Sequence, residues 1–221
     1  MFGIDWATIG PLYARAFGQT LYMVSVAMVA GGLAGLVLGT LLYTTRRGGL
    51  LQNRLVYNVL NFVVNLIRPI PFILLLAFIG PLTLAVVGSQ IGTEAVIFPL
   101  AIAASFAVSR IVEQNLVTID PGVIEAARAM GASPLRIILT LLVPEALGPL
   151  ILGYTFMFIA VVDASAVAGI IGGGGLGDLA IVYGYQRFNY PVTLLAVITI
   201  IVIVQLVQVL GNALARRALR R

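Results

Sequence analysis

The feature that most constrains the fold is a series of long apolar stretches with almost no charge. The clearest cover about residues 21–43, 150–171 and 192–211, and two more cover about 59–79 and 95–108. A helix needs about 20 mostly apolar residues to cross the hydrocarbon core of a bilayer. We therefore predict an all-α, polytopic membrane protein with five transmembrane helices, built as a single domain over residues 1–221.

Composition supports this class and excludes several kinds of chemistry. Hydrophobic residues make up 61% of the chain and charged residues only 10%, whereas soluble domains carry roughly 25%. All 13 basic residues are arginines, and His, Cys and Lys are absent. A phosphate-binding loop of the Gly-Lys-Ser/Thr type needs a lysine, a thiolate metal site needs Cys, and a zinc site of the HExxH type needs His. We expect no catalytic residue, no metal site and no cofactor in this chain.

The two shorter stretches are less regular. Arg68 interrupts the stretch 59–79 just before Pro69 and Pro71, so we predict a helix kinked by the prolines; an alternative span would run over 69–87. The stretch 95–108 is short unless Arg110 lies at the membrane interface. Glu113 beyond it is expected to be a solvated charge at the boundary.

The arginines predict which way the chain crosses the membrane. With five spans, nine arginines fall on one side, namely Arg46, Arg47, Arg54, Arg128, Arg136, Arg216, Arg217, Arg220 and Arg221. Only Arg15 and Arg187 fall on the other side. Cytoplasmic loops carry the excess of positive charge. The N-terminus is therefore expected outside, with the C-terminus and the longest loop in the cytoplasm.

A stripe of small residues marks the first span. Ala27, Gly31, Gly35 and Gly39 recur at every fourth position, so in a helix they share one face. Such a face lets another helix backbone approach closely. The partner could be a helix of the same chain or a second subunit, and the spacing does not separate these two.

The long loop between the third and fourth spans contains signals for two short helices. Over residues 118–144, which we call the elbow, Asp120-Pro121 predicts a helix start and Gly131 its end. Ser133-Pro134 predicts a second start, with a helix over 135–142 that Pro144 ends. This pair of helices is too polar to insert into a bilayer.

The spacing of the elbow resembles the permease subunits of type I ATP-binding-cassette importers. Their signature is Glu-Ala-Ala, three residues, Gly, nine residues, Ile, one residue, Leu-Pro. The present chain has Glu125-Ala126-Ala127, Gly131, Leu141, Val143 and Pro144 at the matching positions. The resemblance implies that the elbow is a coupling helix docked on a separate ATPase. It implies an ATPase-coupling role for Glu125, Ala126, Ala127, Arg128, Gly131 and Pro144.

Four further stretches resemble D/L-methionine importer permeases in particular. They are residues 65–72, 125–134, 142–147 and 173–177 with 183–185. The resemblance implies a homodimer in the bacterial inner membrane, docked on two ATPase subunits that hold ATP and Mg²⁺. An external substrate-binding lipoprotein would supply the cargo, and nucleic acid has no role. Another small amino acid or solute is the alternative cargo within the same family.

An interpretation without coupling places the elbow flat on the lipid, with Arg128 and Arg136 touching phosphates. This accounts for the arginines but not for the spacing from Glu125 to Pro144. A short capped helix can be pushed as a rigid body by a partner, as a chain without a nucleotide site requires.

Candidates for lining the translocation path come from polar residues at membrane depth. Charges there are costly and usually face a cavity or a partner, so Arg68 and Asp163 are candidates. Asn61 and Asn65 recur at helical spacing and either line a wet path or cross-link helices. Arg68 and Asp163 could instead form a structural pair with each other. A stand-alone ion-driven carrier or channel is the rival class, but it would usually show several intramembrane acids, and only Asp163 is present.

Overall fold

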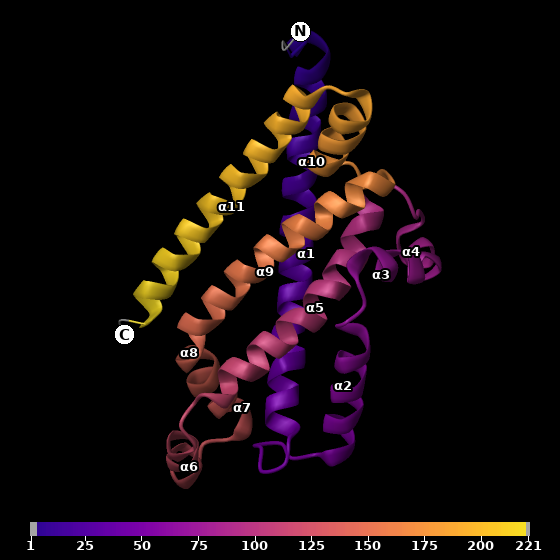
Figure 1. The fold of residues 1–221 in the computed structure, drawn as a ribbon. Helices are drawn as coiled ribbons and strands as arrows, with labels where there is room; N and C mark the ends of the chain where they lie inside the picture. The colour runs from indigo at the N-terminus through magenta and orange to yellow at the C-terminus, as the bar shows by residue number, and fades with distance from the viewer. Residues whose placement is uncertain (1–3, 220–221) are drawn as a thin grey trace.

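The computed structural model describes residues 4–219, and within that range every regular element is helical. Four helices are long and apolar enough to cross a membrane: α1 (Trp6–Thr45), α5 (Thr93–Val117), α9 (Leu147–Ala168, extended to Gly173 as a span) and α11 (Tyr190–Leu219). The bent pair α2 (Arg54–Ile67) and α3 (Phe72–Phe78) supplies a fifth. The predicted all-α class is confirmed. Figure 1 shows α1 running the length of the molecule, with α5, α9 and α11 crossing it obliquely.

Helix α1 is much longer than the apolar stretch that predicts it. Its 40 residues correspond to about 60 Å at 1.5 Å per residue, twice the roughly 30 Å of a bilayer core. The predicted span 21–43 forms only the later part of α1. The side chain of Asp5 caps the first turn by accepting from the backbone N–H of Ala7 at 3.1 Å.

The second predicted span is broken rather than kinked. Helices α2 and α3 are bent by 108°, and α4 (Gly80–Val87) follows directly. Pro69 and Pro71 lie in the break. Proline lacks an N–H and disfavours helical geometry in the residue before it, so two prolines separated by one residue end a helix more effectively than a single kink.

Helix α5 extends beyond the predicted span 95–108. It continues without a break through Arg110 and Glu113 to Val117. These two side chains are 14% and 13% exposed and form an ion pair, so Glu113 is not the solvated boundary charge expected from the sequence. Mutual neutralisation allows both charges to lie on a packed helix.

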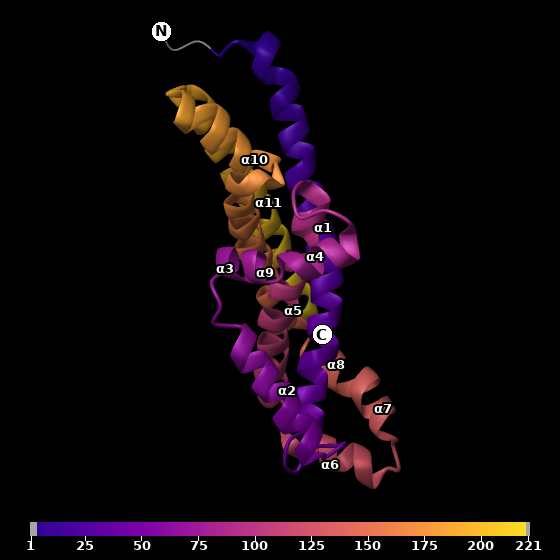
Figure 2. The same ribbon diagram turned by 90° about the vertical axis from the view of Figure 1, so that its right-hand side faces the viewer.

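The short elements gather at the two ends of the molecule. At one end lie α6 (Pro121–Ala129), α7 (Pro134–Ile137), the π-helical η1 (Ile138–Leu142) and α8 (Val143–Glu145). At the other end lie η2 (Gly169–Gly173), α10 (Gly175–Asp178), η3 (Leu179–Gly184) and η4 (Tyr185–Arg187). Figures 1 and 2 show these groups at opposite ends of α1.

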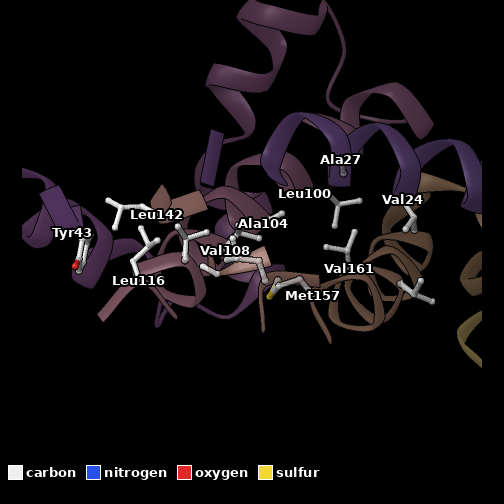
Figure 3. Close-up of a cluster of buried hydrophobic side chains, with 14 of the residues drawn as sticks. Val24, Ala27, Tyr43, Leu100, Ala104, Val108, Leu116, Leu142, Met157 and Val161 are labelled. Atoms are coloured by element: carbon white, nitrogen blue, oxygen red, sulfur yellow. The ribbon is translucent and has the colours of Figure 1, made fainter. Parts of the chain in front are cut away.

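The small-residue stripe of α1 packs against α5 of the same chain. A Cβ added at Gly35 would lie 2.6 Å from Cβ of Val108, and one added at Gly39 would lie 2.6 Å from Cβ of Val112. Figure 3 shows Ala27, Ala104 and Val108 in this buried cluster, which continues to Leu116 and to Leu142 of the elbow. Of the two partners that the sequence left open, the structure selects packing within the chain.

Candidate functional site

The first elbow helix, α6, begins and ends where local signals predict. The backbone N–H of Gly122 donates to Oδ1 of Asp120 at 2.8 Å, and Pro121 occupies the first turn. Gly131 follows with φ of +79°, a conformation that side chains other than glycine rarely adopt. The N–H of Ala132 then donates to the carbonyl of Ala127 at 3.1 Å. These contacts make α6 a short, defined rod.

The second part of the elbow does not stop at Pro144, contrary to the prediction. Ser133 caps α7 by accepting from the N–H of Arg136 at 3.4 Å, and the helix then widens into η1 and continues to Glu145. In η1 the N–H of Val143 donates to the carbonyl of Ile138, five residues earlier. A single π turn shifts the hydrogen-bond register by one residue. Pro144 therefore lies inside a continuous helical path.

The base of the elbow is buried in the membrane domain. Ala127, Ile137 and Leu142 have 6%, 1% and 0% of their surface exposed, and they belong to the same apolar cluster as Tyr43 and Leu116. This cluster joins the elbow to the ends of α1 and α5. Packed interiors have low compressibility and transmit strain, so this contact is a candidate mechanical route from the elbow to both helices.

The opposite side of the elbow is exposed and has both apolar and charged residues. Met130 is 82% exposed, Leu135 65% and Leu139 61%. Glu125, Ala126, Arg128 and Arg136 are also exposed. We call these seven residues the elbow face. Apolar side chains rimmed by charges are typical of a protein contact surface. The motif identified Glu125, Ala126 and Arg128, but the apolar members could be found only from the structure.

A polar cluster joins α2 to α5. One terminal nitrogen of Arg110 donates to Oδ1 of Asn61 at 2.5 Å and to Oδ1 of Asn65 at 2.7 Å, and the other donates to Glu113. The amide of Asn65 donates to Oδ1 of Asn61 at 3.2 Å. Asn61 and Asn65 thus cross-link two helices, one of the two roles considered from the sequence.

Three comparisons place the chain among known proteins. Residues 31–220 match the family described as binding-protein-dependent transport system inner membrane component. The chain belongs to that family. It is 44% identical over 206 residues to the probable D-methionine transport system permease protein MetI of Vibrio cholerae, covering 93% of this chain and 92% of that protein. It is 41% identical over 194 residues to the methionine import system permease protein MetP of Bacillus subtilis, covering 88% and 87%.

Solved structures agree with the sequence relatives of this permease. A structure of the MetNI methionine ABC transporter in an inward-facing conformation superimposes with a TM-score of 0.92 and 38% identity, covering 95% of this chain and 97% of that chain. An amino acid ABC transporter with 22% identity superimposes with a TM-score of 0.78, which shows the shared fold alone. The resemblance to importer permeases found in the sequence is therefore confirmed.

The remaining charged residues predicted for the path of the permease lie apart from the polar cluster. Arg68 is exposed in the break between α2 and α3, and Asp163 is exposed on the later part of α9, five residues before its end. Among residues 4–219 the ion pair within 4.0 Å is Arg110 with Glu113, so Arg68 and Asp163 do not pair with each other. Arg110 was not among the predicted path residues. It lies only two residues beyond the predicted span 95–108, and its contacts with Asn61 and Asn65 of α2 became visible only in the structure.

Proposed function

We propose that this permease is the membrane subunit of an ATP-driven methionine importer in the bacterial inner membrane. It would act as a homodimer that docks on two separate ATPase subunits. The observation that carries the proposal is the match of nearly the whole chain to the MetNI methionine transporter at 38% identity. The methionine permeases of Vibrio cholerae and Bacillus subtilis support the same substrate.

The elbow face is proposed as the contact with the ATPase. The chain contains no lysine and hence no phosphate-binding loop of the Gly-Lys-Ser/Thr type, so ATP and Mg²⁺ would be bound by the partner. Work must then arrive through a contact surface. Glu125, Ala126 and Arg128 lie on the exposed side of α6, whereas Ala127 lies on its buried side. In this arrangement Gly131 sets the turn, and Pro144 lies where the elbow joins α9.

Asp163 is the strongest support for a second copy or a wet path. Its side chain is exposed in the isolated chain although it lies well inside the apolar span Leu147–Gly173. A carboxylate facing lipid at this depth would cost several kcal/mol. We propose that Asp163 faces the space between the two copies. Arg68, Asn61 and Asn65 would lie along the same translocation path.

The arginine distribution supports an orientation with the elbow in the cytoplasm and the N-terminus outside. The ATPase would then contact the cytoplasmic end. An external substrate-binding lipoprotein would deliver methionine to the opposite end, near α10. Closing of the ATPases on ATP would move both elbows and expose the path to the two sides of the membrane in turn.

The decisive experiment combines purification with transport. The tagged permease, extracted gently from native membranes, should carry a stoichiometric P-loop ATPase, and the Glu125→Arg variant should lose both this partner and methionine uptake while still inserting into the membrane. Glu145→Arg, the same charge reversal at an exposed carboxylate one residue beyond the elbow, is the matched control and should keep both. A permease that arrives alone yet moves solute into liposomes without ATP would instead establish the carrier class. Uptake of a different amino acid would keep the importer class and change the cargo.

A further inference from the structure

A second polar site lies at the end of the molecule opposite the elbow. It is a cavity of about 310 Å³ lined by Arg15 and Gln19 of α1, Thr93 of α5, the loop 172–174, and Asp178 and Tyr183. Figure 1 places this end beside α10 and the start of α1. The α1 residues of the cavity precede the apolar stretch that begins at residue 21, so the cavity is reachable from water.

Two opposite charges face this cavity without neutralising each other. Arg15 and Asp178 both line it, yet the ion pair found within residues 4–219 at 4.0 Å or less is Arg110 with Glu113. Asp178 is half-buried, and this burial raises the pKa of its carboxyl above the ordinary 3.8. Each of these two unpaired charges would be stabilised by a ligand group of the opposite charge, through a charge-assisted hydrogen bond.

The walls of the cavity are held by hydrogen bonds and glycine geometry. Oε1 of Gln19 accepts from the N–H of Gly175 at 3.0 Å, and Oγ1 of Thr20 accepts from the N–H of Leu176 at 2.8 Å. A Cβ added at Gly174, where φ is +74°, would lie 2.7 Å from that Gln19 oxygen. The N–H of Gly92 donates to the carbonyl of Gly172 at 3.0 Å. The cavity is therefore formed before any ligand arrives, which limits the entropy lost on binding.

We propose that this cavity binds a free zwitterionic amino acid, with its α-carboxylate at Arg15 and its α-ammonium at Asp178. The inference rests on the proposed function of the chain as an amino-acid importer and adds a substrate-binding site on its outer side. A simple anion would be repelled by Asp178, and a metal cation by Arg15. A ligand with both charges satisfies both side chains. The volume is at the lower end of the range for small-molecule pockets, roughly 300–1,000 Å³, which suits a ligand as small as methionine.

The test measures binding of methionine and two analogues to the intact permease–ATPase complex in lipid nanodiscs, without the external binding protein. The analogues are methioninol, which lacks the carboxylate, and 4-methylthiobutanoate, which lacks the ammonium group. The wild-type complex should bind methionine at least about tenfold more tightly than either analogue, the effect of one charged hydrogen bond. Equal affinity for all three compounds, or no binding of methionine by a complex that transports methionine, would overturn the proposal without any variant being made.

Variants then assign the two charges. Arg15→Gln should weaken methionine at least about tenfold and abolish its advantage over methioninol. Asp178→Asn should weaken methionine similarly and abolish its advantage over 4-methylthiobutanoate. The controls are Arg187→Gln, whose guanidinium stacks on the Tyr183 ring at 4.7 Å without lining the cavity, and Glu94→Gln, next to Thr93. Both should stay within about twofold of wild type.

Outcomes for the site and for the proposed function can be told apart. Methionine uptake by the complete transporter with binding insensitive to Arg15→Gln and Asp178→Asn would overturn the site and leave the function standing. Uptake of a different amino acid, whose binding shows the same dependence on these two residues, would overturn the methionine assignment and support the site.

Discussion

Helices α1 and α2 follow one another in the chain but form very different contacts. Helix α1 buries 14 of its residues, including Gly31, Gly35 and Gly39 against α5. Helix α2 buries only Val64, and its described hydrogen bonds to α5 run through the side chain of Arg110. The α1–α5 contact is thus complete within one chain, whereas α2 is held mainly by a polar cluster and leaves most of its surface free.

Helix α2 has two distinct faces, and only the last part of the polar one, at Asn61 and Asn65, contacts α5. Arg54, Tyr57, Asn58, Asn61 and Asn65 recur every three or four residues and share one side of the helix. A separate apolar row consists of Leu55, Val59, Phe62 and Leu66, which are 75%, 52%, 66% and 57% exposed. A helix with a polar face and an exposed apolar face at membrane depth is suited to a place between a wet path and another apolar surface. The difference from α1 indicates which part of the chain is rigid by itself and which part is completed by assembly.

The largest expected effect comes from disrupting the α1–α5 contact. In Gly35→Leu, the new Cβ alone would lie 2.6 Å from Cβ of Val108 and 2.8 Å from the carbonyl oxygen of Ser105. Overpacking of this kind should lower the free energy of unfolding by about 3 kcal/mol or more. We expect little monodisperse protein after detergent extraction. Gly18→Leu, on the same helix with nothing within 4 Å of the added Cβ, should give wild-type yield. Normal folding of Gly35→Leu would show that α1 and α5 can separate.

A smaller effect is expected from removing the polar cluster. Arg110→Leu removes the donor to Asn61 and Asn65 and leaves the mostly buried Glu113 without its partner. We expect a loss of about 2 kcal/mol, less than for a fully buried pair, and a looser α2. Because the chain has no cysteine, spin labels can be attached at Leu55→Cys in α2 and Gln114→Cys in α5.

The measured distance distribution between these labels should broaden in Arg110→Leu. Arg68→Leu removes an exposed arginine at the end of α2 and should leave both the distribution and the stability unchanged. An unaltered distribution in Arg110→Leu would mean that apolar packing, rather than the polar cluster, holds α2 in place.

A substitution at Asp163 tests whether the surface that a second copy would complete also lines the translocation path. Asp163→Asn should lower methionine uptake at least about tenfold, by analogy with the loss of one charged contact. The stability of the permease should change by less than about 0.5 kcal/mol, as expected for an exposed site. Glu94→Gln, at the start of α5, is the control for a lost carboxylate. A normal KM and rate in Asp163→Asn would remove this residue from the path.

The smallest effect concerns the residues that cap the N-termini of α1 and α2. Asp5 caps α1 and can titrate, whereas Asn53 caps α2 and cannot. Hydrogen bonds from the Thr8 hydroxyl and the Ala7 backbone N–H hold the pKa of Asp5 below its usual 3.8. Its capping is therefore fully present above pH 3.8 and is lost as the pH falls through the lower folded-state pKa. Asn53 caps α2 by accepting from Leu55 and Val56, each at 3.1 Å, and carries no titrating proton.

Hydrogen-exchange protection factors can test this difference directly. Protection of the Ala7 amide should fall below about pH 3.8, whereas that of the Val56 amide should stay constant after correction for intrinsic exchange. Asp5→Asn should make the start of α1 equally insensitive to pH. Parallel loss at both caps would indicate general unfolding rather than titration of Asp5.

The features that could be predicted from the sequence are those with local causes. Asp120, Pro121 and Gly131 set the ends of α6 through contacts within a few residues, and the small-residue stripe follows from helical spacing. The 108° break between α2 and α3 was underestimated because the combined effect of Pro69 and Pro71 depends on the packing around them. The continuation of α5 through Arg110 could be foreseen only in part. Its ion pair with Glu113 is local, but its other hydrogen bonds go to side chains 45 and 49 residues away.

The π turn at η1 has a consequence for how the elbow is aimed. A π turn amounts to one residue inserted into an α-helix, and each residue turns an α-helix by about 100°. The single extra residue in Ile138–Leu142 therefore sets the rotation of the elbow about the helix axis relative to the membrane domain. The orientation of the elbow relative to α9 thus depends on the number of residues at this place. At exposed positions between Gly131 and Pro144, such as Leu135 and Leu139, a changed side chain should therefore disturb the elbow less than a residue added or removed.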